Sequence, residues 1–385
     1  MIKTIALYTF ILIGTTSFAS QWEQRANFGA NGRHRATAIS IGTKGYLGLG
    51  HYNGAGPNVI LNDWWEYDPG TNSWTQKSDY PSGGGVGDYG VISFGMETAG
   101  FVGSGQIFGN EFYKYDPMLN QWIQMSSPSI SHSNTQAFVI DNKAYCMNAG
   151  GDVMYSYDAD LDIWSVEAFR PFTLGYWNSC FSIDGLGYVK TGNTLWQYKA
   201  STQQWLQRAP FPGLATGGSV SFVQNGKGYI VSGYGGSLSL VQSEVWEYDP
   251  FANTWTQLPD FEGTSRRFAS GFSIGNKCFL GTGTNGTNFN DFWQFDALAS
   301  SVNELNDIGT VNVFPNPAST YTRIVVEKLT QFEVEIYDLT GKLIRKEMTS
   351  TNEIMLDRGT LNTGVYFYSI LQNGTVLYSN KLIFN

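Results

Sequence analysis

A ten-residue pattern recurs along most of the chain and constrains its fold more than any other feature. Each copy ends in a Trp that lies seven residues after an aromatic residue. The five copies are WEYDPGTNSW ending at Trp74, YKYDPMLNQW at Trp122, YSYDADLDIW at Trp164, WQYKASTQQW at Trp205 and WEYDPFANTW at Trp255. A repeat of this kind is typical of architectures that use one supersecondary unit many times.

The aromatic residues of this pattern extend the repeat to a sixth unit. They are Tyr67, Tyr115, Tyr157, Tyr198, Tyr248 and Phe295, separated by 48, 42, 41, 50 and 47 residues. These intervals match the size of a four-stranded propeller blade. Gly-bounded apolar runs lie between them, and a content of 15% aromatic residues and 45 glycines favours short strands and tight turns. The sequence therefore predicts an all-β fold with six blades.

The two ends of the repeat region predict how the ring of blades closes. The sixth unit has Val302 where the others have Trp, whereas Trp22 has no aromatic partner before it. We expect the segment around Trp22 to supply the outer strand of the sixth blade, because this pairing leaves no open sheet edge. The predicted fold is a six-bladed β-propeller over residues 21–300, closed by an N-terminal strand.

The repeat resembles the kelch superfamily in its aromatic-Asp-Pro turn, in the Asn that follows and in the Trp seven residues on. The resemblance covers residues 21–300 and implies a kelch-like β-propeller. The third unit departs from the pattern with YDAD and the fourth with YKAS, where the other units have YDP. These differences concern single turns and leave the period intact.

The remaining sequence differs in character and predicts a second domain. A polar stretch follows Phe295, and alternating strands bounded by Asn, Gly and Pro come after it. VFPNPAS at 313–319, IYDLTGKLI at 336–344, LNTGVYFYSI at 361–370 and the final KLIFN resemble, in this order, the type A C-terminal sorting domain of the bacterial type IX secretion system. The resemblance implies a linker at 301–310 and a small β-sandwich at 311–385, whose partner is the type IX secretion machinery. An Ig-like spacer is the alternative.

The first residues predict export. Lys3 precedes an apolar run at 5–13, and Ser17 and Ala19 form a small-residue cleavage site, which is typical of a signal peptide over residues 1–20. The apolar run is too short to span a bilayer, so no transmembrane segment is expected in the mature protein. We expect a protein that passes through the periplasm and across the outer membrane and is secreted or held at the cell surface. A net charge of −9 argues against nucleic acid as a partner.

The sequence offers little for metal or redox chemistry. Only three His are present, and the kelch-related copper-radical oxidases need two His, a Tyr and a crosslinked Tyr-Cys pair that the chain does not display. Asp158, Asp160 and Asp162 alternate as calcium ligands do, but they occupy the position of the Asp-Pro turn, and a turn is expected. The cysteines, Cys146, Cys180 and Cys278, are predicted to be buried apolar residues, with a Cys146–Cys180 bridge as the alternative. We expect neither a metal nor a cofactor.

The arginines indicate a ligand site at one mouth of the propeller. Of seven in residues 21–300, four precede the innermost strands of the first and sixth units. An alignment of GRHRATAISIGTKGY with TSRRFASGFSIGNKCF places Arg33 against Arg266 and His34 against Arg267. We expect the loops at 50–62 and 233–244 to surround the same mouth. The predicted ligand-binding residues are Arg33, His34, Arg35, Asp88, Tyr89, His132, Asn134, Tyr176, Trp177, Arg266 and Arg267.

These residue types suggest the chemistry of the ligand. Arg forks bind carboxylates, and the faces of Tyr176 and Trp177 suit sugar rings, which together favour an acidic glycan or a protein carboxylate. No nucleophile-base set stands out, so our hypothesis is a non-catalytic binding or adhesion module without catalytic residues. The alternative is an enzyme acting on acidic sugars, similar to the exported kelch-type sialic acid mutarotases. A second alternative is that the arginines brace adjacent blades.

Overall fold

The structure is a computed structural model and describes residues 21–53, 56–129, 131–297, 308–338, 342–372 and 375–385. The chain divides into a compact unit of Ser20–Ala299 and a second unit that contains Ser300–Asn385. The signal peptide expected at 1–20 and most of the linker expected at 301–310 lie outside the described residues. No helix in the described part of the chain is long and apolar enough to span a membrane.

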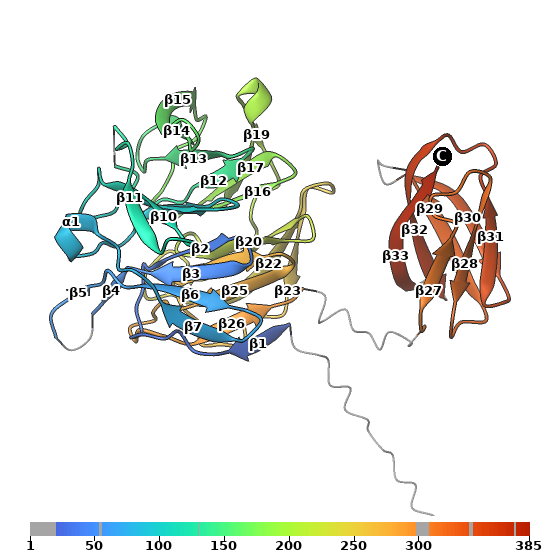
Figure 1. The fold of residues 1–385 in the computed structure, drawn as a ribbon, viewed down its shortest axis with the longest axis horizontal. Coiled ribbons are helices and arrows are strands. Elements are labelled where there is room, and N and C mark those ends of the chain that lie inside the picture. Colours follow the sequence, from blue (N-terminus) through green and yellow to red (C-terminus); the bar gives the residue numbers. More distant parts are fainter. Residues whose placement is uncertain (1–20, 54–55, 130, 298–307, 339–341, 373–374) are drawn as a thin grey trace, which may run out of the picture. The chain divides into compact units, whose positions relative to one another are not determined.

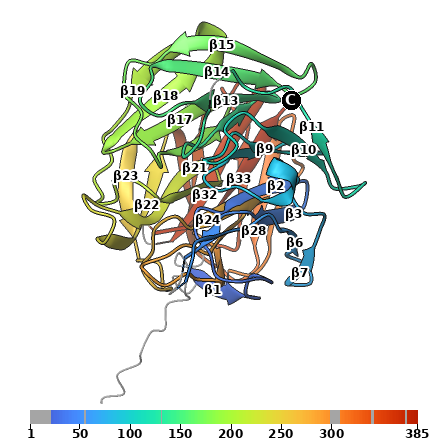
Figure 2. The same cartoon turned by 90° about the vertical axis from the view of Figure 1, so that its left-hand side faces the viewer.

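Six four-stranded antiparallel sheets make up the first unit, and Figure 2 shows them arranged around a common axis. Blades 1 to 3 are β2 (Thr37–Ile41), β3 (Lys44–Gly48), β6 (Trp64–Asp68), β7 (Ser73–Gln76); β8 (Ile92–Gly95), β9 (Gly100–Gly103), β10 (Phe112–Asp116), β11 (Gln121–Gln124); and β12 (Phe138–Ile140), β13 (Lys143–Met147), β14 (Val153–Asp158), β15 (Ile163–Phe169). Blades 4 and 5 are β16 (Ser179–Ile183), β17 (Leu186–Thr191), β18 (Thr194–Lys199), β19 (Gln204–Gln207); and β20 (Val220–Gln224), β21 (Lys227–Tyr234), β22 (Val241–Asp249), β23 (Thr254–Leu258). The all-β, six-bladed propeller predicted from the repeat is confirmed.

Blade 6 closes the ring as expected. It consists of β24 (Ser270–Ile274), β25 (Lys277–Gly281), β26 (Phe292–Phe295) and the N-terminal β1 (Trp22–Arg25). β1 pairs antiparallel with β26, and Trp22 lies opposite Phe295. The Trp22 ring also packs edge-on against Phe261, with 4.7 Å between ring centroids. Trp22 therefore occupies the place that Trp74 and its equivalents occupy in the other blades.

The repeated Tyr, Asn or Asp, and Trp join blades 1, 2, 3 and 5 to the preceding blade. In blade 2, Asn120 Oδ1 accepts hydrogen bonds from Tyr115 Oη and from the backbone N–H of Ser78, both at 2.9 Å. Trp122 Nε1 donates to the Ser78 carbonyl at 2.8 Å. Ser78 belongs to the segment that leaves blade 1, so the motif connects two blades. Asn72, Asp162 and Asn253 do the same in blades 1, 3 and 5. The Asp162 carboxylate is thereby occupied by turn contacts, as expected.

Glycines at the start of the second strand let adjacent blades approach. A Cβ at Gly45 would lie 2.1 Å from the Phe272 ring, and one at Gly187 would lie 2.1 Å from Phe138. In both pairs the Phe is on the innermost strand of the preceding blade. The packed Gly-aromatic pairs bury the apolar faces of the sheets against each other, which is where the core lies. All three cysteines are free and buried within this core.

The second unit is a β-sandwich, as predicted. One sheet contains β27 (Val311–Phe314), β28 (Tyr321–Val326) and β31 (Glu353–Asp357). The other contains β30 (Leu343–Thr349), β29 (Phe332–Tyr337), β32 (Gly364–Gln372) and β33 (Thr375–Phe384). Buried side chains from both sheets, including Ile324, Val334 and Phe384, form one core. Asn316 of the VFPNPAS motif accepts the N–H of Ile383 at 2.9 Å, so the first and last motifs lie together.

Candidate ligand site at the propeller mouth

A closed ring of backbone hydrogen bonds surrounds one opening of the central channel. The segment that leads into each innermost strand contains one residue with a left-handed backbone, with φ between 54° and 65°. Each N–H donates to the carbonyl of its counterpart in the preceding blade, at 2.7 to 3.2 Å. The six residues are Arg35, Gly90, Asn134, Trp177, Gly218 and Phe268. We call this arrangement the peptide ring. It links every blade to both neighbours at the mouth.

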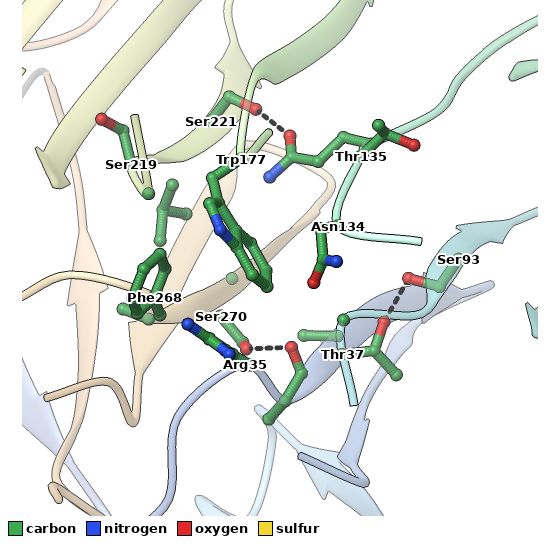
Figure 3. A pocket seen from close by; sticks show the side chains of 18 of the residues that line it. Arg35, Thr37, Ser93, Asn134, Thr135, Trp177, Ser219, Ser221, Phe268 and Ser270 are labelled. Atoms are coloured by element: carbon green, nitrogen blue, oxygen red, sulfur yellow. Dashed lines mark hydrogen bonds between the residues drawn. The ribbon is translucent and has the colours of Figure 1, made fainter. Parts of the chain in front are cut away.

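A cavity of about 200 Å³ lies in the channel at the peptide ring. All six blades contribute to its wall, through their innermost strands or the segments just before them, mostly with Ala, Gly, Ser and Thr. Figure 3 shows Arg35, Trp177 and Phe268 together on one side of it, and Thr37 bonded to Ser93. Arg35 is the one charged residue among the described residues of the wall. The cavity is thus a narrow neutral space with a single cation at its edge.

Arg33 and Arg266 do not face this opening. Their side chains are 1% and 0% exposed. Arg33 binds both carboxylate oxygens of Asp63 and donates to the Leu49 carbonyl at 3.1 Å. Arg266 binds Asp291 at 2.5 and 2.7 Å and donates to the Thr282 carbonyl at 3.0 Å. Their donors are used within the protein, which corrects the expectation that they bind a ligand and favours the bracing alternative.

Arg35 and Arg267 behave differently although each lies beside a buried arginine in sequence. Neither forms an ion pair with any described residue, and the Nε of each is buried without a hydrogen-bond partner in the part of the chain that the structure describes. The Arg35 guanidinium lies 4.7 Å from the Trp177 ring centroid and 4.8 Å from that of Phe268. Burial lowers the pKa of both guanidinium groups. Two partly desolvated cations without a carboxylate are unfavourable unless an anion joins them.

Two histidines from blade 1 lie beside these arginines. The rings of His34 and His51 are 4.0 Å apart, and their backbones form a β-bridge. Each Nδ1 lies 2.7 Å from an Asn Oδ1, that of Asn288 for His34 and that of Asn58 for His51. Since this oxygen only accepts, Nδ1 carries the proton and Nε2 keeps its lone pair. Burial, together with the neighbouring His51, lowers the pKa of His34 to about 3, and burial lowers the pKa of His51. Both rings are neutral at pH 7.

The other predicted site residues divide into two groups. Tyr89 and Trp177 lie near Arg35, and Asn134 belongs to the peptide ring. Tyr176 precedes Trp177 and is 62% exposed.

Asp88 and His132 are fully buried, so the expectation that they bind a ligand is corrected. Asp88 accepts backbone N–H groups of the β9–β10 loop, and His132 stacks on Trp164. Both therefore hold loops in place.

Three mouth residues were not among the predicted site residues. His51 stacks on Tyr89 at 4.4 Å, Phe268 contacts Arg35, and Tyr234 lies 5.7 Å from Phe268. The sequence indicates these three residues only through their positions in the repeat. His51 and Tyr234 each follow the glycine that ends the second-strand motif, in GLGH and VSGY, and Phe268 aligns with Arg35 in the repeat.

The described residues contain no cluster of three or more His, Cys, Asp or Glu side chains that suits a metal ion. What the mouth offers instead is two guanidinium groups, two neutral imidazoles and several aromatic faces. This set suits the binding of an anion that also carries a flat or apolar face.

Each of the two units contains a segment that matches the model of a known family. Residues 215–261 match the family model of the Kelch motif, and residues 312–385 match that of the secretion system C-terminal sorting domain. The first unit is therefore a kelch-type β-propeller. The second unit is a C-terminal sorting domain of the type IX secretion system, and the protein is exported across the outer membrane to the cell surface or the medium.

Several characterised proteins are similar to parts of the chain. N-acetylneuraminate epimerase of Haemophilus influenzae (strain PittEE) is 33% identical over 105 residues, which cover 26% of this chain and 28% of the relative. The Salmonella typhi enzyme of that name is 28% identical over 155 residues, 37% of this chain and 40% of the relative. The ulvan lyase NLR42 of Nonlabens ulvanivorans is 29% identical over 94 residues, 24% of this chain and 17% of the relative.

The matched segments therefore span less than half of each of these relatives. The solved structure of YjhT superposes with a TM-score of 0.58 at 14% identity and covers 70% of this chain and 95% of that chain. This likeness concerns the fold.

Proposed function

We propose that the exported propeller is a binding module that holds a carboxylate-bearing sugar at its mouth. The observation that carries the proposal is the pair Arg35 and Arg267, which are partly desolvated, stacked on aromatic rings and without a carboxylate among the described residues. An anionic ligand would supply the missing partner. The Trp177 and Phe268 rings beside Arg35 suit the apolar face of a pyranose.

Calorimetric titration of the full chain with glucuronate and with N-acetylneuraminate tests this proposal. The double variant Arg35→Ala and Arg267→Ala should lose at least 100-fold in affinity, because each charged hydrogen bond contributes about 1.5 to 3 kcal/mol. Arg208→Ala is the matched control, since Arg208 donates to Tyr248 and Pro250 and lies outside the mouth. Equal affinity in the double variant and the control contradicts the proposal.

A second candidate function is the interconversion of the anomers of an acidic sugar. It rests on His34, whose Nε2 keeps its lone pair, and on the similarity to the N-acetylneuraminate epimerases; the Nε2 of His51 is buried, and the His51 ring supports the His34 ring instead. Proton NMR would follow the anomer exchange of N-acetylneuraminate with and without the protein. Acceleration that is lost in His34→Gln supports the enzyme, and an unchanged exchange rate supports the binding module alone.

A further inference from the structure

The wall around the mouth is uneven. On blade 1 residues 49–63 join β3 to β6 and include the hairpin of β4 (His51–Tyr52) and β5 (Val59–Ile60). Blades 6 and 2 use residues 282–291 and 104–111 for the same connection. Blade 5 extends its strands to the pair Tyr234–Val241. Figure 1 shows β4, β5 and the short helix α1 (Ser82–Gly85), which lies between blades 1 and 2, projecting from one side of the propeller.

Blades 3 and 4 have a much lower wall. Residues 148–152 connect β13 to β14, and on blade 4 Gly192 and Asn193 alone connect β17 to β18. A two-residue hairpin turn cannot rise above its own strands. The mouth is therefore open toward blades 3 and 4 and enclosed on the other sides.

The charged groups and the exposed aromatic lie on different sides of this mouth. Arg35, Arg267, His34 and Tyr234 come from blades 1, 5 and 6, on the enclosed side. Tyr176 comes from blade 4, on the open side, and is 62% exposed without a ring contact or hydrogen bond from its side chain to any described residue. Its backbone is nevertheless held, since Gly175 N–H donates to Thr191 Oγ1 at 3.1 Å and Trp177 N–H donates to Asn134 at 2.7 Å. An aromatic ring so placed suits an extended ligand.

We infer that the ligand is the acidic end unit of a longer glycan, whose chain leaves the mouth over blades 3 and 4 and stacks on Tyr176. This inference rests on the proposed function, because the arginines hold the end unit. The connecting segments of blades 1, 2 and 6 are longer than those of blades 3 and 4, so the side of blades 3 and 4 offers the chain more room, and Tyr176 provides an aromatic surface there. A free monosaccharide would leave Tyr176 without a contact.

The backbone around the mouth favours a glycan over a peptide. Peptide recognition commonly uses main-chain hydrogen bonds to an unpaired strand edge. Here the six N–H groups and six carbonyls of the peptide ring are bonded to each other, so they offer no such edge. Aromatic faces and guanidinium groups are what the mouth presents, and these suit sugar rings and carboxylates.

Affinity measurements on the full chain test the inference. The probes are the methyl α-glycoside of N-acetylneuraminate and 3′-sialyllactose, together with methyl glucuronoside and a glucuronate-terminated disaccharide. We expect the longer member of at least one pair to bind about 10-fold more tightly. Tyr176→Ala should remove this difference and leave the affinity for the methyl glycoside unchanged. Tyr52→Ala is the matched control, because Tyr52 is 41% exposed on the enclosed side, and it should preserve the difference.

The outcomes separate this inference from the proposed function. If the methyl glycosides bind through Arg35 and Arg267 and the longer glycans bind no more tightly, the chain-end inference is wrong and the proposed function stands. If Tyr176→Ala leaves the difference intact, the path over blade 4 is wrong. If no member of either pair binds, the proposed function is overturned and this inference with it. Tighter binding of a carboxylate-terminated peptide than of any glycan would also overturn it.

Discussion

Arg33 and Arg35 are two residues apart, yet they belong to regions of opposite character. Arg33, like Arg266 in blade 6, is buried against a carboxylate and a backbone carbonyl. Arg35, like Arg267, lies at the mouth against aromatic rings without a carboxylate among the described residues. We call these the brace layer and the mouth layer. The comparison indicates that the partners of an arginine, and not its place in an arginine-rich motif, decide whether it stabilises the fold or can bind a ligand.

The brace layer also has a third, incomplete member. Arg170 is 5% exposed and donates to the Asn148 carbonyl at 3.0 Å, the position equivalent to Leu49 and Thr282. Strand pairing shows that Val153 stands where blades 1 and 6 have Asp63 and Asp291. Arg170 Nε and Nη1 lack a hydrogen-bond partner among the described residues. Blade 3 thus has a cation without the paired carboxylate of blades 1 and 6, although the charge of the nearby Asp152 acts on Arg170.

The largest expected effect is on folding, from Arg33→Ala. Breaking a buried ion pair leaves the Asp63 carboxylate without its partner, so we expect a loss of about 3 to 5 kcal/mol in the free energy of unfolding. Arg35→Ala should change it by less than about 1 kcal/mol, since the removed group has no carboxylate partner. Urea unfolding followed by Trp fluorescence measures this for the propeller, because all 12 Trp lie at or before Trp293. Equal losses in the two variants would abolish the distinction between the layers.

A smaller loss of stability is expected when a lysine replaces an arginine of the brace layer. The positive charge is then kept, but the forked guanidinium group is lost. Arg266→Lys retains a cation beside Asp291 but cannot bind both carboxylate oxygens and the Thr282 carbonyl. We expect a loss of about 1.5 to 3 kcal/mol, the contribution of one charged hydrogen bond. Arg267→Lys is the matched substitution in the mouth layer and should be close to neutral. Full stability of Arg266→Lys would mean that charge alone holds blade 6.

Acid should lower the stability of the protein through His34, which lies beside the mouth layer. The pKa of His34 is lowered to about 3 in the folded protein, below the ordinary value of about 6.5. The unfolded chain therefore takes up the proton first, and stability that is full above pH 6.5 is lost as the pH falls toward 3. The loss for His34 should reach about 2 kcal/mol at pH 5. Urea unfolding of the protein and of His34→Gln at pH 7 and pH 5 tests this, and identical pH dependence would rule it out.

The smallest expected effect is a gain in the free energy of unfolding. Val153→Asp would give Arg170 the carboxylate that Arg33 and Arg266 already have, and a stabilisation of about 1 kcal/mol is expected from one added net hydrogen bond. Val153→Asn, which adds a polar group of similar size without the charge, is the control. Destabilisation by both substitutions would mean that a carboxylate at position 153 does not reach the Arg170 guanidinium.

The repeat made the fold predictable because blades 1, 2, 3 and 5 make the same contacts; in blade 4, where Gln203 replaces the Asn, Tyr198 Oη and Trp205 Nε1 lack a hydrogen-bond partner among the described residues. The Tyr-Asn-Trp pattern is a set of hydrogen bonds between blades, as Asn120 and Ser78 illustrate, so its period revealed the ring. The unmatched Trp22 revealed the closure for the same reason. Local departures such as YDAD did not matter, because Asp158 accepts the N–H groups of Asp160 and Leu161 as Asp116 does in the YDP turn of blade 2.

The site was predictable only in part. The alignment of Arg33 with Arg266 and of His34 with Arg267 was sound, but sequence position does not reveal depth. Asp63 and Asp291, which bury the first pair, lie 30 and 25 residues from their arginines, and nothing in the local motif pointed to them. His51 and Tyr234 reach the mouth from β4 and from the extended end of β21, whose courses the repeat does not predict.

The peptide ring has a consequence for how such a protein can change. Its circumference is set by main-chain atoms alone, so the bore of the channel does not depend on which side chains stand at the six positions. In this chain two of these positions are Gly and the others carry an arginine, an amide and two aromatic rings. The side chains at the six positions differ, whereas the ring itself consists of main-chain hydrogen bonds. A substitution there keeps the main-chain hydrogen bonds but must fit a left-handed backbone, and at Gly90 a Cβ would lie 2.2 Å from Asn134 Oδ1.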